Sequence, residues 1–130
     1  MTLEERMQAA SQVRAKGYNC AQTMLAAFPD ILTLPADISL RLGTALGGGI
    51  GLTGNICGVV SGMAVLEGMR TDGSPAAKAA TYKSVNALHA RFAGEHGATL
   101  CPDLKARKIP CNDLIQSGIR IYYEHLREND

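Results

Sequence analysis

Apolar residues recur every three or four positions along most of the chain, which is the spacing of amphipathic helices. Near the N-terminus, Thr2 and Glu5 have the spacing of a capping box, so we expect a helix over residues 3–16. A second helix should begin near Asn19 and end at Pro29, because proline disfavours a helical conformation in the residue before it. The first thirty residues are therefore typical of two short helices.

The same spacing continues toward the C-terminus, interrupted by glycines over residues 47–54, where we expect a loop. The further helices that the pattern predicts are a short one from Asp37, then 55–69, 75–96, a single turn after Pro102, and 111–127. The inward stripe of the longest helix should be Ala77, Tyr82, Val85, Leu88 and Phe92. In the last helix the inward residues should be Leu114, Ile115, Ile119, Tyr122 and Leu126.

No run of β-branched residues alternates with polar ones, and no internal repeat or linker divides the chain. A chain of 130 residues fits one domain and can bury an ordinary core. We therefore predict an all-α fold, a compact single-domain bundle of five to seven helices with a glycine-rich loop, covering residues 1–130.

Charge and composition narrow the choice of partners. The net charge is +1, with 13 basic and 12 acidic residues, so we expect no nucleic-acid binding. Aromatic residues make up only 5% of the chain, and glycine occurs 14 times. A core of small aliphatic residues and many glycines predicts helices whose backbones approach closely.

Two segments of the sequence indicate where in the cell the protein is located. Residues 42–66 carry no charge and are long enough to span a bilayer, but their many glycines supply too little apolar surface, so we expect no membrane span. Residues 1–17 include Glu4 and Glu5 and no long apolar run, so we expect no secretory signal and a cytoplasmic protein. Cytoplasmic thiols stay reduced, which favours redox chemistry or metal binding over structural disulfides.

The four cysteines share one position in the predicted pattern, the N-terminus of a helix. They are Cys20, Cys57, Cys101 and Cys111. Unpaired backbone N–H groups at a helix start favour the thiolate, which is the form that attacks disulfides and binds metals. We therefore take all four as candidate catalytic residues and as candidate metal ligands. The alternative is that they are buried thiols that only fill the core.

Glycines follow the second cysteine at helical spacing. Gly58 and Gly62 lie four residues apart on one face of the predicted helix, directly after Cys57. A face without side chains admits another backbone or a bound group, so these glycines are candidates for cofactor binding, and the alternative is a seam between packed helices. The free space makes Cys57 the candidate for the central sulfur.

These residues resemble the redox-active proteins of the C_GCAxxG_C_C family, which carry four cysteines and a C-G-A-x-x-G element. The resemblance runs from segment 17–22 through the glycines 47–49 into segment 57–62, and ends with Cys101 and Cys111. It covers most of the chain.

The match to the family's element has one exception, and the resemblance also implies a function. Val59 stands where the family's element has alanine. A related module in split-Soret cytochromes has similar cysteines associated with an iron–sulfur centre, so the resemblance implies an iron–sulfur cluster or a metal ion as a candidate cofactor here.

Several functions therefore stay open. The first is thiol–disulfide cycling or electron transfer with a redox partner protein, a small thiol or an electron donor. The second is binding of an iron–sulfur cluster or another metal by the same cysteines. The third is a helical scaffold without enzymatic activity, and a homodimer is expected with any of them. A dinucleotide site is disfavoured: Gly49, Gly51 and Gly54 match G-x-G-x-x-G, but no βαβ unit surrounds them.

Other polar residues are weaker candidates. The histidines at positions 89, 96 and 125 lie on predicted helices beside core positions, so we expect structural roles for them. Lys105, Arg107 and Lys108 lie between the last two cysteines. We expect a solvated loop there, and the alternative is that these cations hold a thiolate or meet an anionic partner.

Overall fold

The structure, a computed structural model, describes residues 1–129 and is helical throughout, with no strand in that range. The α-helices are α1 (Leu3–Ala15), α2 (Cys20–Ala26), α3 (Pro29–Leu32), α4 (Ala36–Gly43), α5 (Gly47–Ile50), α6 (Gly58–Met69), α7 (Lys78–His96), α8 (Cys101–Ala106) and α9 (Cys111–Glu128). Two 3₁₀ turns, η1 (Thr44–Leu46) and η2 (Pro75–Ala77), precede α5 and α7. The prediction of an all-α fold is confirmed.

The helices outnumber the five to seven that the sequence predicts. The sequence pattern predicts only that Pro29 ends the second helix. In the structure this proline is also the first residue of a further short helix, α3. The segment α5 is irregular, because Gly48 and Gly49 have positive φ angles of 67° and 72°. Without α5, eight helices stand in the described part of the chain, and the expected glycine loop is partly replaced by this turn.

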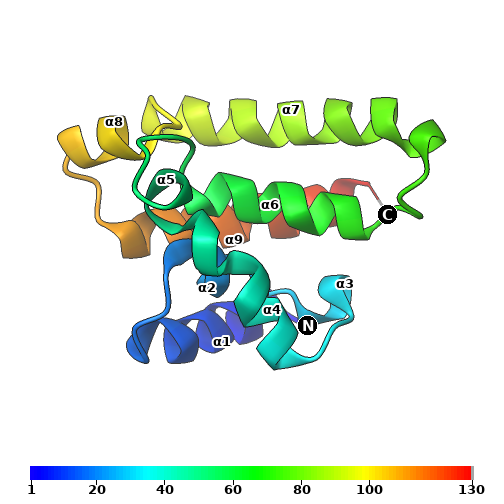
Figure 1. Ribbon diagram of the computed structural model, residues 1–130, viewed down its shortest axis with the longest axis horizontal. Coiled ribbons are helices and arrows are strands. Elements are labelled where there is room, and N and C mark those ends of the chain that lie inside the picture. The colour runs from blue at the N-terminus through cyan, green and yellow to red at the C-terminus, as the bar shows by residue number, and fades with distance from the viewer. Residues whose placement is uncertain (130) are drawn as a thin grey trace.

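The long helices α6, α7 and α9 run alongside one another, and α1 to α4 form the remainder of the bundle (Figure 1). Helix α2 lies at the centre, in contact with α1, α4, α6 and α9. Its residues Met24 and Leu25 are fully buried, as is Phe28 after its end. This short helix therefore joins the two parts of the bundle, and it carries Cys20 at its first residue.

Helix α9 matches its predicted pattern, since Leu114, Ile115, Ile119 and Tyr122 are all buried. Helix α7 matches only in part. Leu88 and Phe92 are buried, but Tyr82 is 64% exposed. The prediction for Tyr82 is wrong because a periodic stripe does not show how far the neighbouring core extends, and here the core covers only the C-terminal half of α7.

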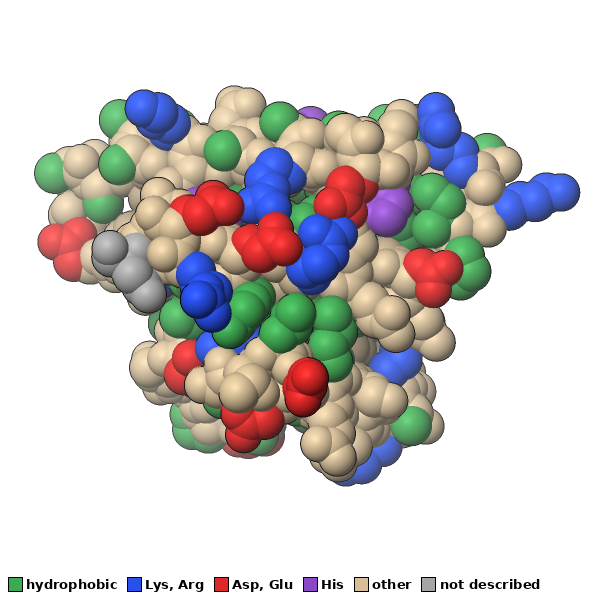
Figure 2. Space-filling view, turned by 180° about the vertical axis from the view of Figure 1, so that it is seen from behind, with side chains coloured by type: hydrophobic (Ala, Val, Ile, Leu, Met, Phe, Trp, Pro, Cys, Tyr) green, Lys and Arg blue, Asp and Glu red, His purple; other side chains and the backbone are tan. Residues whose placement is uncertain are grey.

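The surface carries mixed charges. Across the face formed by α7 and α9, acidic and basic side chains alternate (Figure 2), and Arg120 pairs there with Glu95 at 2.6 Å. No helix in residues 1–129 combines the length and apolar character needed to cross a membrane.

Candidate functional site: a cavity lined by four cysteines

Four sulfurs that are far apart in the sequence meet at one small cavity of about 20 Å³. The lining residues are Cys20, Cys57, Cys101, Cys111, Leu104, Lys105, Ile109 and Leu114. The volume is about that of a single water-sized probe. The fold thus gathers the cysteines of α2, α6, α8 and α9 around one point.

Each cysteine stands at the start of a helix, as the sequence predicts. Cys20, Cys101 and Cys111 are the first residues of α2, α8 and α9, and Cys57 is the N-cap residue of α6. Two details differ from the prediction. Helix α6 begins three residues later than expected, so Cys57 precedes the helix, and Leu100 rather than Cys101 takes the N-cap position of α8.

A backbone link explains both shifts and joins two of the sulfurs. The N–H of Cys57 donates to the carbonyl of Thr99 at 2.8 Å, and the N–H of Cys101 donates to the carbonyl of Asn55 at 2.9 Å. Ile56 and Leu100 form an isolated antiparallel bridge between them. These bonds hold the chain before α6 extended and fix the start of α8 beside the start of α6.

Asn19 fixes the position of Cys20. Its side chain accepts a hydrogen bond from the N–H of Gln22 at 2.8 Å, and the N–H of Asn19 donates one to the side-chain oxygen of Gln22 at 2.9 Å, which completes a capping box. The Asn19 side chain also donates to the carbonyls of Gly43 and Thr44, at 3.2 and 3.1 Å. The residue before the sulfur is therefore locked to the end of α4.

The glycines near the cavity allow backbones and sulfurs to approach. A Cβ placed on Gly58 would stand 3.0 Å from the Sγ of Cys20, and one on Gly62 would stand 2.9 Å from Met24. A Cβ on Gly49, whose φ is 72°, would stand 2.9 Å from the Cβ of Cys101. Gly58 and Gly62, proposed above as cofactor contacts, thus face α2 across a helix seam.

The sulfurs of Cys20 and Cys57 form a hydrogen-bonded pair. The pKa of Cys20 is lowered to about 6, chiefly because the Cys57 thiol donates a hydrogen bond to it; burial opposes this shift, and the Arg14 charge and the Gly48 N–H contribute to it. The pKa of Cys57 is raised, first by this bond to the Cys20 sulfur and then by burial, since Cys57 is only 4% exposed. Of the two sulfurs, Cys20 is therefore the one that ionises first, and Cys57 is the one that keeps its proton.

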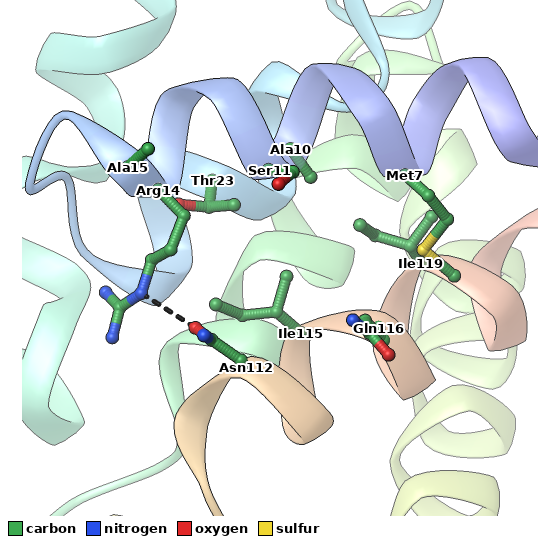
Figure 3. Close-up of a pocket in the computed structure, with 10 residues that line it drawn as sticks. All are labelled: Met7, Ala10, Ser11, Arg14, Ala15, Thr23, Asn112, Ile115, Gln116 and Ile119. Carbon is green, nitrogen blue, oxygen red and sulfur yellow. Dashed lines mark hydrogen bonds between the residues drawn. The ribbon is translucent and has the colours of Figure 1, made fainter.

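Arg14 of α1 connects two of the cysteine-bearing segments. Its Nε donates to the side-chain oxygen of Asn112 at 3.1 Å (Figure 3). Its Nη1 donates to the carbonyl of Tyr18 at 2.8 Å. Tyr18 lies two residues before Cys20, and Asn112 directly follows Cys111. No sequence signal identified Arg14, because a surface arginine on an amphipathic helix is common.

Arg14 also lines a larger cavity of about 390 Å³ between α1 and α9 (Figure 3). Apolar side chains, among them Met7, Ile115 and Ile119, line it together with a few polar ones. No cysteine borders it. The larger cavity therefore lacks the thiols from which the sequence predicts the function. The four-cysteine cavity is the better candidate for the functional site.

The cysteines, as they are arranged here, do not fit a metal centre. Within residues 1–129 no group of three or more His, Cys, Asp or Glu side chains is arranged to hold a metal ion. The cavity has room for about one water molecule, and an iron–sulfur cluster contains several iron and sulfide atoms. We therefore derive no chemistry through a metal or cluster. All four cysteines are free thiols.

The histidines are placed away from the sulfurs, and none of them lines the four-cysteine cavity. His96 hydrogen-bonds Ser117 at 2.8 Å. His125 hydrogen-bonds Glu67 at 3.0 Å, and both side chains are buried. No pattern in the sequence points to Glu67, since a single acidic residue in a helix is usually exposed.

Comparison with known proteins identifies one match. The model of a family described as "Putative redox-active protein (C_GCAxxG_C_C)" matches residues 18–125. The matched range contains all four cysteines and begins after α1, so Arg14 lies outside it. No curated protein and no solved structure matches the chain.

Proposed function

We propose, from the fact that the chain belongs to the C_GCAxxG_C_C family of redox-active proteins, that it performs thiol–disulfide exchange with Cys20 and Cys57 as the reacting pair. The observation that carries the proposal is the meeting of Cys20 and Cys57 at the four-cysteine cavity, where a hydrogen bond from Cys57 lowers the pKa of Cys20. A thiolate beside a second thiol is the arrangement that dithiol exchange requires.

The reaction proceeds in two exchanges. The Cys20 thiolate attacks one sulfur of a substrate disulfide, forms a mixed disulfide and releases the first substrate thiolate. Cys57 then loses its proton and attacks the Cys20 sulfur, which breaks the mixed disulfide and releases the second substrate thiolate. The two released thiolates take up protons, one of which comes from Cys57. Two electrons pass from the pair to the substrate, and a Cys20–Cys57 disulfide remains.

Burial assigns the two roles. Cys20 is partly exposed and carries the charge, so it can meet the substrate. Cys57 is buried and protonated, so it is protected from direct attack and reacts only once the mixed disulfide forms beside it. Gly58 contributes by leaving space for the Cys20 sulfur beside the start of α6, and Gly62 contributes by letting Met24 of α2 pack closely against the same helix. In this proposal Cys57 is therefore not the single central sulfur: Cys20 attacks the substrate, and Cys57 resolves the mixed disulfide.

The other two cysteines complete a cycle in this proposal. Cys101 and Cys111 are partly exposed on the same cavity. As a second dithiol they attack the Cys20–Cys57 disulfide, which restores the first pair and leaves a Cys101–Cys111 disulfide nearer the surface. An external thiol of a reducing compartment such as the cytoplasm then reduces this disulfide.

Anaerobic purification followed by a thiol count tests the proposal. We expect a colourless protein with four titratable thiols that loses about two of them to one equivalent of a small disulfide and regains them with dithiothreitol. In the Cys20→Ser and Cys57→Ser variants the same treatment should not oxidise two thiols to an internal disulfide, because one member of the reacting pair is missing. A brown protein that contains iron and sulfide would contradict the proposal and favour the metal-binding alternative.

A further inference from the structure

The charged side chain in the wall of the four-cysteine cavity is a positive one. Of the residues that line the four-cysteine cavity, Lys105 of α8 is the only charged one, and the rest are cysteines and aliphatic residues. Lys105 is also exposed, so this residue belongs both to the wall of the cavity and to the surface beside it. A substrate that approaches the cavity from solvent therefore comes near a lysine.

A second cation acts on the same sulfurs from another element. The guanidinium group of Arg14 is hydrogen-bonded to Tyr18, two residues before Cys20, and to Asn112, directly after Cys111. Because of these two bonds its charge is held in place, whereas that of Lys105 is on a flexible side chain. Helices α1 and α8 therefore each place a cation beside the segments that carry the sulfurs.

The acidic residues of this region do not cancel these charges at the cavity. Asp103 and Asp113, in the first turns of α8 and α9, are exposed, and neither lines the cavity. Two further cations follow Lys105: Lys108 is exposed, and Arg107 lies against Gly97, where a Cβ would stand 2.7 Å from its Nη1. Basic side chains are visible at the end of the molecule that holds α8, on the right in Figure 2.

From this placement, and resting on the proposed function, we infer that the substrate is a small disulfide that carries carboxylates close to its S–S bond. A carboxylate pairs with Lys105 while the adjacent sulfur meets Cys20. The cavity holds about one water molecule, so the disulfide does not enter it whole and must bring its S–S bond to the partly exposed Cys20, which a small disulfide does more easily than a bulky one. The same positive charge offsets the repulsion between the anionic substrate and the attacking thiolate.

Three small disulfides of similar length that differ in charge test the inference. They are 3,3′-dithiodipropionate, which is anionic, 2-hydroxyethyl disulfide, which is neutral, and cystamine, which is cationic. Reduction of each by the fully reduced protein is measured under anaerobic conditions and divided by its reduction rate with dithiothreitol, which removes intrinsic differences in reactivity. We expect the anionic disulfide to react about three- to tenfold faster than the cationic one at low salt, with the preference shrinking at high salt.

Charge variants separate Lys105 from the general charge of the protein. In Lys105→Glu the preference should disappear or reverse, and Lys105→Met should give an intermediate result. The matched control is Lys83→Glu, the same change at an exposed position of α7 that does not line the cavity. The control should keep the wild-type order of rates.

The outcomes separate the inference from the proposed function. Equal normalised rates for the three disulfides, or an unchanged order in Lys105→Glu, would overturn the inference and leave the thiol exchange intact. Reduction of none of the three would overturn the proposed function and this inference with it. An anionic preference that disappears only in the Lys105 variants supports it.

Discussion

Gly58 lies directly against Cys20 at the seam between α6 and α2. A Cβ on Gly58 would stand 3.0 Å from the Cys20 Sγ and 3.0 Å from the backbone nitrogen of Ala21. Neither distance is an ordinary contact, so the absence of a side chain at this position sets how closely the first residue of α2 approaches the start of α6. The proximity of Cys20 to Cys57 depends on that approach.

We predict that Gly58→Ala disturbs the cysteine pair more than it disturbs the fold. Alanine improves helix propensity by about 1 kcal/mol, and overpacking against α2 costs about 1–3 kcal/mol, so the net loss should be about 1 kcal/mol. The displaced Cys20 should lose part of its hydrogen bond to Cys57. Urea unfolding measures the stability, and alkylation at different pH values measures the thiol.

The matched control is Gly68→Ala in the same helix, where a Cβ would meet nothing within 4 Å. This variant should gain up to about 1 kcal/mol and leave the reactivity of Cys20 unchanged. If both variants behave alike, the seam does not position Cys20.

A second prediction concerns the pH dependence of Cys20. Its pKa is lowered to about 6 chiefly because Cys57 donates a hydrogen bond to it. Alkylation of Cys20 by iodoacetamide should therefore rise with pH around 6 and level off above it. In Cys57→Ala the donor is gone, so the midpoint should move upward toward the ordinary value of 9.0. Mass spectrometry of the Cys20 peptide gives the rate.

The control for this measurement is Cys111→Ala. Cys111 lines the same cavity but is not among the groups that shift the pKa of Cys20. The midpoint should stay near 6 in this variant. An equal shift in both variants would mean that the general polarity of the cavity, and not the bond from Cys57, sets the pKa of Cys20.

A third prediction follows from the packing of Val59 on α6 against Gly118 on α9. A Cβ on Gly118 would overlap Cγ1 of Val59, so valine and glycine form a matched large–small pair here. Gly118→Ala should therefore lose about 1–3 kcal/mol of stability. Val59→Ala leaves a cavity and should lose about 2 kcal/mol.

A double-mutant cycle checks this pairing by chemical denaturation. The double variant with alanine at both positions should be more stable than the sum of the single losses predicts, by about 1 kcal/mol or more, since the new methyl fills the space left by valine. Additive losses would show that the two positions do not share this space.

A fourth prediction concerns the buried Glu67. It accepts hydrogen bonds from Tyr122 at 2.8 Å and Arg70 at 3.0 Å and contacts His125 at 3.0 Å. Burial raises the pKa of Glu67, but these partners outweigh burial, and the net pKa is lowered below 4.5. Glu67→Leu leaves several buried polar groups without an acceptor and should cost about 3 kcal/mol or more.

The sign of the pH effect follows from the lowered pKa. The unfolded chain takes up the proton first, so the stabilisation from ionised Glu67 is fully present above pH 4.5 and is lost as the pH falls through the folded-state value. The conservative variant Glu67→Gln should show a flatter loss of stability in this acid range. Glu4→Gln, at an exposed position of α1, serves as the control and should follow the wild type. An acid profile of Glu67→Gln identical to that of the wild type would contradict the role of the ionised carboxylate.

The sequence predicted the helical class and the helix starts at the cysteines, because both depend on local signals. Capping residues such as Asn19 and prolines such as Pro110 act within a few positions of the helix that they begin. The same local logic missed α3, whose proline both ends one helix and starts the next. It also placed Tyr82 in the core, since burial depends on how far a neighbouring helix reaches.

The electrostatics of the site could not be predicted from the sequence. The low pKa of Cys20 comes from Cys57, thirty-seven positions later in the chain, and from Arg14 on α1. The positions of Lys105 at the cavity and of Glu67 beneath Tyr122 also depend on helix packing. Spacing alone favoured Cys57 as the central sulfur, whereas helix packing lowers the pKa of Cys20 and raises that of Cys57.

Disulfide mapping of the oxidised protein shows which two sulfurs react first. Anaerobically reduced wild-type protein is treated with one equivalent of a small disulfide, quenched with acid at successive times from the earliest that can be sampled, alkylated, digested and analysed by mass spectrometry. We expect the Cys20–Cys57 disulfide to form first, before any Cys101–Cys111 disulfide that follows from it, and dithiothreitol to reverse it. If another pair of cysteines forms the earliest disulfide, or if all four cysteines remain alkylatable, Cys20 and Cys57 are not the reacting pair.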